Sequence, residues 1–180
     1  MTEQDIKEVY ARTLKLDDSL IEPYGGELVQ SFVQANMRHE VHQHILQLKR
    51  VEISAGELVE LKMIAIGAYS PLTGFMNRET YNSVLTSATL PNGMSWGVPV
   101  TLAVTGAVAK TLTEGEEVAL FRHGEAGGVM QLTDIFLWNA EREAQLLGDP
   151  VSLTYPQITT RKLRNAEYLL GGPISFLASR

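Results

Sequence analysis

The most informative segment of the chain is residues 64–76, which read Ile64-Ala65-Ile66-Gly67-Ala68-Tyr69-Ser70-Pro71-Leu72-Thr73-Gly74-Phe75-Met76. Its apolar start is typical of a buried helix. Gly67 and then Pro71 end that helix, because proline disfavours helical geometry at the residue before it. Ser54 and Glu57 have the spacing of a capping box, so the helix is expected to begin at Ser54. The segment therefore predicts a mostly buried helix that runs into a tight loop.

The residues on either side of this segment predict further helices. From Phe32 to Leu48, apolar side chains recur three or four residues apart, which predicts an amphipathic helix. Residues 23–26 predict a turn, and residues 1–20 are interpreted as an extension that begins with a short helix. Beyond the loop, Asn77 is expected to cap another helix.

The second half of the chain favours strands. Residues 98–104 are β-rich, with Pro99 near their start. Residues 117–122 and 129–132 predict a hairpin whose turn is the glycine-rich run 124–128. Strand structure is expected to continue to about Trp138.

The last part of the chain returns to strand after one short helix. Asn139 is expected to cap a helix from Ala140 to Leu147. Residues 168–170 and 174–177 predict two strands joined by a turn at residues 171–173. Helices that come first and strands that come later predict an α+β domain.

Composition limits the classes of function. The 180 residues suffice for one sizeable core, which buries about 70% of the surface of the unfolded chain. A formal net charge of -6 gives no general attraction to nucleic acid or to an anionic membrane. The absence of cysteine excludes disulfides and thiolate chemistry, and no apolar run reaches the ~18 residues of a membrane span. We therefore expect a cytoplasmic protein with no membrane contact and no cofactor.

Several segments resemble one family. The Ser-Pro-Leu-x-Gly-Phe-Met loop is similar to a segment in the amino-terminal domain of ATP sulfurylase (sulfate adenylyltransferase). Further segments resemble that domain in the same order, at residues 23–29, 92–102, 114–120, 141–144 and 168–173. The resemblance extends from about residue 20 to residue 177. It implies a PUA-like mixed β pseudobarrel with flanking helices.

The same resemblance implies an accessory role. In the family's reaction, sulfate attacks the α-phosphorus of ATP to give adenosine 5′-phosphosulfate and pyrophosphate. Arginine, histidine and backbone N–H groups stabilise the charge that develops. The family's Gln-x-Arg-Asn-Pro, His-x-x-His and Gly-Arg-Asp segments do not follow Pro173. The chain also has Tyr155-Pro156-Gln157-Ile158 where the family usually has His-Pro-Gly-Val.

These observations predict a domain that does not catalyse by itself. We expect one ATP-sulfurylase-type PUA-like domain over residues 1–180, with residues 151–180 forming a connector and the final strands, and without the catalytic nucleotidyltransferase domain. We expect it to dock to a catalytic domain, in the same or a separate chain, within sulfate assimilation. The alternative is a stand-alone PUA-like binding module for RNA.

Two groups of residues are candidates for contact with a partner. The first is the loop, which has a structural interpretation and a secondary docking interpretation, and consists of Ser70, Pro71, Leu72, Gly74, Phe75 and Asn77. The second is the basic cluster of Arg161, Lys162 and Arg164, which is the best candidate for RNA contact. Its other interpretation is a solvated connector that meets an acidic surface of the next domain.

The histidines are weak metal candidates. His39 and His42 lie near each other on a predicted helix, whereas His44 falls close to the apolar stripe. A regular helix cannot direct all three at one ion, so a solvated helix face is the favoured interpretation and no metal site is predicted. Trp96 and Trp138 are interpreted as core or barrel-rim packing, not as platforms for base stacking.

Overall fold

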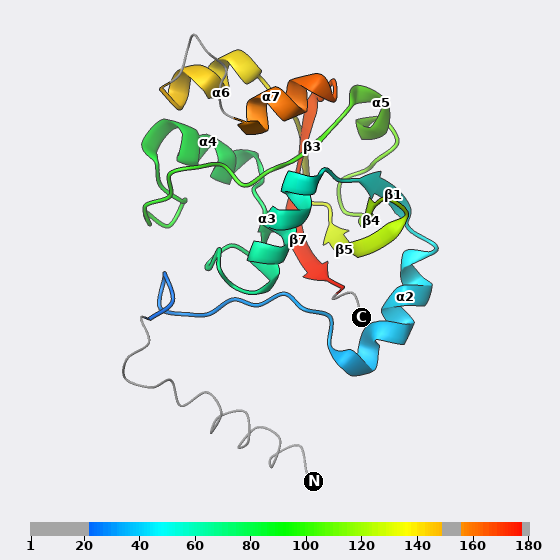
Figure 1. The fold of residues 1–180 in the computed structure, drawn as a ribbon. Helices are drawn as coiled ribbons and strands as arrows, with labels where there is room; N and C mark the ends of the chain where they lie inside the picture. Colours follow the sequence, from blue (N-terminus) through cyan, green and yellow to red (C-terminus); the bar gives the residue numbers. More distant parts are fainter. Residues whose placement is uncertain (1–21, 149–155, 178–180) are drawn as a thin grey trace.

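The computed structural model describes residues 22–148 and 156–177 (Figure 1). The elements of the first half are η1 (Ala35–Met37), α2 (Arg38–Ile45), β1 (Lys49–Glu52), α3 (Ala55–Ala65), β2 (Gly74–Phe75), α4 (Arg78–Ser87) and β3 (Leu102–Val104). Those of the second half are α5 (Gly106–Ala109), β4 (Glu117–Arg122), β5 (Glu125–Gln131), β6 (Asp134–Leu137), α6 (Ala140–Leu146), α7 (Pro156–Leu163) and β7 (Tyr168–Phe176). The helix expected within residues 1–20 lies outside the described residues.

Strand β7 organises the sheet. The strand order is β1-β4-β5-β7-β2, and β3 and β6 also pair with β7. The first half of β7 lies between β3 and β6, and its second half lies between β5 and β2. All of these pairings are antiparallel, whereas β1 pairs with β4 in parallel. One long strand shared by four neighbours curls the sheet, and this confirms the predicted mixed α+β fold.

The curl depends on glycines where backbones approach closely. A Cβ added to Gly74 would lie 1.9 Å from the carbonyl oxygen of Gly172. A Cβ added to Gly172, where φ is +153°, would lie 1.9 Å from the carbonyl oxygen of Gln131. Since no side chain fits at these distances, β2 and the end of β5 can approach β7 only because these positions are glycine.

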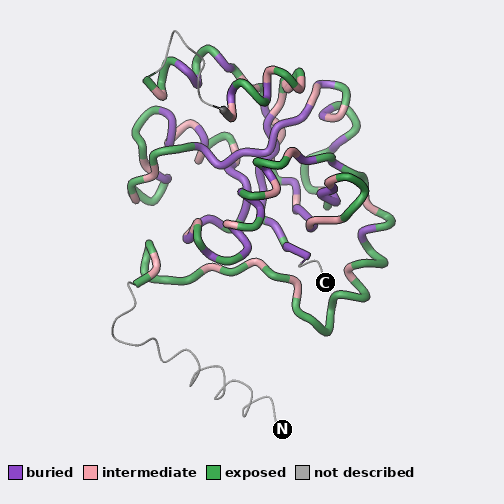
Figure 2. Tube along the Cα trace, viewed as in Figure 1, coloured by how far each residue is buried: buried purple, intermediate pink, exposed green. Residues whose placement is uncertain are grey.

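Helices cover both faces of the sheet (Figure 1). The main core includes Leu61, Ile64, Leu120 and Leu170, all fully buried between α3 and the strands. On the other side, Ile45 of α2 packs in a second cluster that includes Phe121. Helices α6 and α7 pack against each other at the top of Figure 1 through a small third cluster. Figure 2 shows buried backbone through the centre and exposed stretches around it.

Predicted helix starts are confirmed where a polar side chain caps the helix. Ser54 and Glu57 form the predicted capping box at the start of α3. The side chains of Asn77 and Asn139 accept backbone N–H groups at the starts of α4 and α6. Each cap satisfies N–H groups that have no partner within the helix, so the first residues of these helices are set locally.

The helix predicted from Phe32 to Leu48 is too long. Phe32 forms a bridge to Phe176, and η1 and α2 occupy only residues 35–45. The prediction also missed β1, in which only Val51 is buried. The tertiary partners β4 and β7 hold these residues in extended conformations and override the helical period.

Three predictions in the second half are wrong. The hairpin turns at His123 and Gly124 alone, both with positive φ, and the later glycines belong to β5. Residues 171–173 continue β7 and form no turn, because they pair with β2 and β6. Helix α7 was not predicted, and it precedes β7 within the residues expected to form a connector and the final strands.

Candidate functional site

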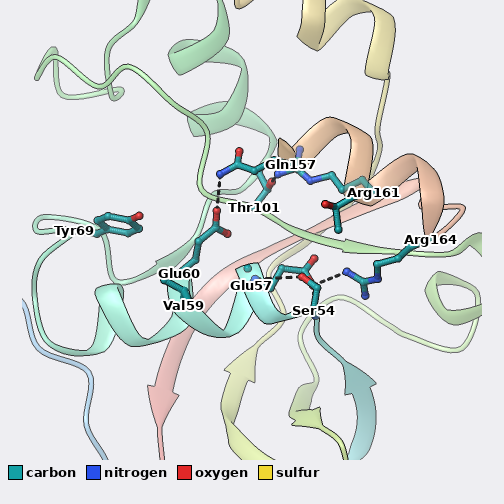
Figure 3. A pocket seen from close by; sticks show the side chains of 11 residues that line it. Ser54, Glu57, Val59, Glu60, Tyr69, Thr101, Gln157, Arg161 and Arg164 are labelled. Carbon is teal, nitrogen blue, oxygen red and sulfur yellow. Dashed lines mark hydrogen bonds and ion pairs between the residues drawn. The ribbon is translucent and has the colours of Figure 1, made fainter. Parts of the chain in front are cut away.

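A cavity of about 350 Å³ lies between α3 and α7 (Figure 3). It is lined by Ser54, Gly56, Glu57, Val59, Glu60, Tyr69, Thr101, Gln157, Thr160, Arg161 and Arg164. Helix α3 supplies two acidic side chains three residues apart, and α7 with the residue that follows it supplies two basic ones, Arg161 and Arg164, three residues apart. Because residues three apart share a helix face, the two helices present opposite charges to each other across the cavity.

The first ion pair joins Glu57 to Arg164. Nη1 of Arg164 donates to Oε2 of Glu57 over 2.6 Å. The same carboxylate accepts the backbone N–H groups of Ser54 and Ala103, over 2.6 and 2.9 Å. Glu57 is thus fully satisfied, and it ties the start of α3 to β3 and to the end of α7.

The second ion pair lies deeper. Nη1 of Arg161 donates to Oε1 of Glu143 over 2.9 Å, and Nη2 donates to the hydroxyl of Thr101. Oε2 of Glu143 accepts from Tyr81 over 2.7 Å and from Trp138 over 2.6 Å. Burial, with the carboxylate of Glu143 beside it, raises the pKa of Tyr81. The network holds α4, α6 and α7 together around one buried carboxylate.

Glu60 differs from the other two acids. Its Oε1 accepts from the side-chain amide of Gln157 over 3.0 Å. Its Oε2 is buried and has no hydrogen-bond partner among the described residues. Burial raises the pKa of Glu60 to about 7, although the nearby Arg161 opposes the shift. Glu60 is therefore the unsatisfied group of the cavity.

The charges around the cavity favour a cation over an anion. Three carboxyl groups, of Glu57, Glu60 and Glu143, meet two guanidinium groups. Both guanidinium groups are already paired with carboxylates. When Glu60 is ionised, a phosphate or sulfate entering this cavity would meet a surplus negative charge, which disfavours an oxyanion there.

The loop residues singled out from sequence are mostly buried. The Ser70 hydroxyl donates to the carbonyl of Gly67 over 2.6 Å and accepts the N–H of Val29 over 3.0 Å. Leu72 and Phe75 lie in the main core. Gly74 pairs with β7, Asn77 caps α4, and the peptide bond before Pro71 is cis. These contacts show what the loop does within the domain, and its docking role stays a prediction.

The three basic residues singled out from sequence come close together on and after α7. Arg161 is buried and paired with Glu143, and Arg164 is paired with Glu57. Lys162 pairs with Glu141 at the surface over 3.0 Å. Each charge has an acidic partner, and RNA contact by this cluster stays a prediction.

The histidines show no metal geometry in the part of the chain that is described. No group of three or more metal-ligating side chains occurs there. His44 instead lies 2.6 Å from Oε2 of Glu117 on the neighbouring sheet. Trp96 packs against Tyr24 and Tyr69, as rim packing predicts, and Trp138 stacks under Arg161.

Sequence reasoning missed the acidic half of the cavity. The signal was present, since Glu57 and Glu60 lie three residues apart in a mostly apolar helix. Gln157 was noticed only as a departure from the resembled family. Its contact with Glu60 spans 97 residues of sequence, which no local pattern indicates.

Comparison with known proteins identifies the class to which this fold belongs. The family model for the PUA-like domain matches residues 21–179, and the chain belongs to this family. The curled mixed sheet with flanking helices is thus the predicted PUA-like fold. Across residues 22–148 and 156–177, no helix has the length and apolar character needed to cross a membrane.

The matching relatives show which type of PUA-like domain this chain contains. The chain is 38% identical over 158 residues to a sulfate adenylyltransferase of Symbiobacterium thermophilum, covering 87% of this chain and 40% of that one. It is 42% identical over 125 residues to a sulfate adenylyltransferase of Synechococcus elongatus, covering 69% of this chain and 32% of that one. The domain is thus of the ATP sulfurylase type, and the chain spans well under half the length of these relatives.

A solved structure shares the fold. It is titled "Hexameric APS kinase from Thiobacillus denitrificans", and the match has a TM-score of 0.66 and 27% sequence identity. The match covers 87% of this chain and 27% of that chain. The same domain is therefore a minor part of a longer protein there as well.

Proposed function

We propose that this chain is the accessory PUA-like domain of an ATP sulfurylase and docks to a catalytic domain in the same or a separate chain. The observation that carries the proposal is the aligned length, because the chain matches only 40% of the sulfate adenylyltransferase of S. thermophilum. The solved neighbour, whose title names an APS kinase, also contains this domain as a minor part of a longer chain. A domain that recurs within larger proteins is expected to pack against their other parts.

The charge of the cavity supports a non-catalytic role. The family's reaction gathers triphosphate and sulfate, which need unpaired cationic donors. Arg161 and Arg164 instead donate to carboxylates within the domain. Activation of sulfate is therefore assigned to the docked catalytic domain. The cytoplasm is the location that we propose for both domains.

The exposed face of α3 is the proposed docking surface. Val59 and Ile66, seven residues apart on the helix, are 51% and 47% exposed, and Leu28 beside Gly67 is 48% exposed. Exposed apolar residues that share one face are typical of protein contact surfaces. We define Leu28, Val59 and Ile66 as the α3 patch and assign it to the catalytic domain.

A chimera tests this assignment. Residues 21–179 would replace the aligned part of the S. thermophilum sulfate adenylyltransferase. The chimera should form adenosine 5′-phosphosulfate. Ile66→Asp should lower the thermal stability of the chimera and should reduce its activity tenfold or more, which corresponds to about 1.4 kcal/mol of docking energy. Leu146→Asp, on α6 and similarly exposed, is the control and should change neither. Equal effects of the two substitutions would contradict docking through the α3 patch.

A further inference from the structure

The unsatisfied oxygen of Glu60 is the starting point. Glu60 is 8% exposed, and its Oε2 has no hydrogen-bond partner within the described residues. A buried carboxylate oxygen without a donor costs free energy, so such an oxygen in a cavity calls for a donor, which a ligand can supply. Gln157 donates only to Oε1 and leaves Oε2 for another group.

The neighbouring charges define what the missing group is. Glu60 faces Glu57 on its own helix, Arg161 on α7 and Glu143 from α6. Arg161 and Arg164 are already paired with Glu143 and Glu57, so a single negative charge is left over when Glu60 is ionised. One positive charge with an N–H donor would satisfy both the charge and the hydrogen bond.

The walls of the cavity define the shape of the ligand. Figure 3 shows Tyr69 to one side of the Glu60 carboxyl group, Gln157 above it, and Val59 below it on α3. An apolar side chain and an aromatic ring at the mouth suit a short alkyl stem that leads to a buried charged head. Of the charged side chains around the cavity, only that of Glu60 lacks a counter-ion among the described residues. A single free carboxylate oxygen does not make a metal site.

We propose that this cavity binds one alkylguanidinium or alkylammonium group, whose N–H donates to Oε2 of Glu60 while its stem packs on Val59 and Tyr69. The Gln157 amide keeps its hydrogen bond to Oε1. The group is either a basic side chain of an adjoining domain or a free small amine. The site goes beyond docking through the α3 patch, because it needs no other domain in order to bind a small cation.

The first experiment titrates the intact chain with ethylguanidinium and observes the carboxyl carbon of Glu60 by NMR. Binding should lower the pKa of Glu60 and shift the side-chain amide of Gln157. Affinity should rise about tenfold from pH 6 to pH 8, because a group with a pKa of about 7 goes from about one-tenth to nine-tenths ionised. Urea, a neutral analogue, and tetramethylammonium, a cation without N–H donors, should have no effect.

Two variants separate a binding site from general charge screening. Glu60→Gln should abolish the response. Gln157→Ala should retain the response, because it removes the donor to Oε1 and leaves the acceptor Oε2 in place. Should Glu60→Gln fail to fold, Val59→Ser gives the same test at an exposed position and should weaken the binding of ethylguanidinium.

The proposal is overturned if ethylguanidinium leaves the pKa of Glu60 unchanged, or if urea acts equally well. The chimera then identifies the source of the cation. If Glu60→Gln destabilises the chimera more than it destabilises the chain alone, the cation belongs to the adjoining domain, and an equal effect assigns it to a free amine. An inactive chimera together with a positive titration would contradict the docking proposal and leave the cation site standing.

Discussion

Nη1 of Arg164 lies 2.6 Å from Oε2 of Glu57, and this contact joins α7 to α3 across 107 residues of sequence. Both residues line the cavity, while the Arg161–Glu143 pair is more deeply buried. Two helices from opposite ends of the chain are thus held together by paired charges, and the stability of the domain should depend on those pairs.

Replacing Arg164 should destabilise the domain moderately. Arg164→Met leaves the Glu57 carboxylate with two backbone donors, and the arginine is partly exposed, so we expect a loss of about 1–2 kcal/mol. The measurement is urea unfolding followed by circular dichroism. Lys162→Met is the control on the same helix, since its solvent-exposed pair with Glu141 should contribute little to stability. Equal losses in the two variants would argue against the Glu57 contact.

Replacing Glu143 should have the largest effect of any charge change. Glu143→Gln leaves the buried guanidinium of Arg161 without a counter-ion, which should cost about 3–5 kcal/mol of unfolding free energy. Urea unfolding measures the loss directly. Glu141→Gln, exposed on the same helix, should leave the unfolding free energy close to that of the parent chain. A Glu143→Gln variant as stable as the parent would contradict the buried network.

Glu60 should make stability depend on pH. Its pKa is about 7 in the folded protein against an ordinary value of 4.5, so the folded state holds the proton more tightly. The contribution of protonated Glu60 to the unfolding free energy is therefore fully present below pH 4.5 and is lost as the pH rises through 7. The loss corresponds to about 3 kcal/mol. The measurement is the unfolding free energy of the parent minus that of Glu60→Gln, followed from pH 4.5 to pH 8. This difference should fall by about 3 kcal/mol. A constant difference would show that Glu60 titrates normally.

The loop glycine Gly74 should be structural. Gly74→Ala places a methyl group 1.9 Å from the carbonyl oxygen of Gly172, so β2 must move away from β7 at a cost of about 3 kcal/mol. Thermal unfolding gives the comparison with Gly97→Ala, where a Cβ meets nothing within 4 Å. A Gly74→Ala variant that unfolds like Gly97→Ala would mean that the two strands are held apart in solution.

Local signals in the sequence predicted the helix starts and the loop. Ser54 and Asn77 act on backbone groups three residues away, so their caps are visible in sequence. The resemblance predicted the pseudobarrel. What the sequence did not reveal depends on distant partners: residues 171–173 look like a turn until β2 and β6 are placed beside them.

The cavity likewise combines residues that the sequence indicated with contacts that depend on distant partners. Arg161 and Arg164 were recognised as a basic cluster, but their acidic partners come from α6 and α3. Isolated charges suggest an RNA contact, whereas paired charges hold helices together. The ion pairs form only when α7 packs against α3 and α6, and that packing depends on contacts across most of the chain.

The most direct test of the central claim is an assay of the purified chain alone with ATP, sulfate and magnesium, measuring adenosine 5′-phosphosulfate and pyrophosphate. The accessory role predicts no product above a blank that lacks protein, while the chimera with the S. thermophilum catalytic part turns over. Formation of adenosine 5′-phosphosulfate by the chain alone would contradict the proposal that catalysis belongs to a docked domain.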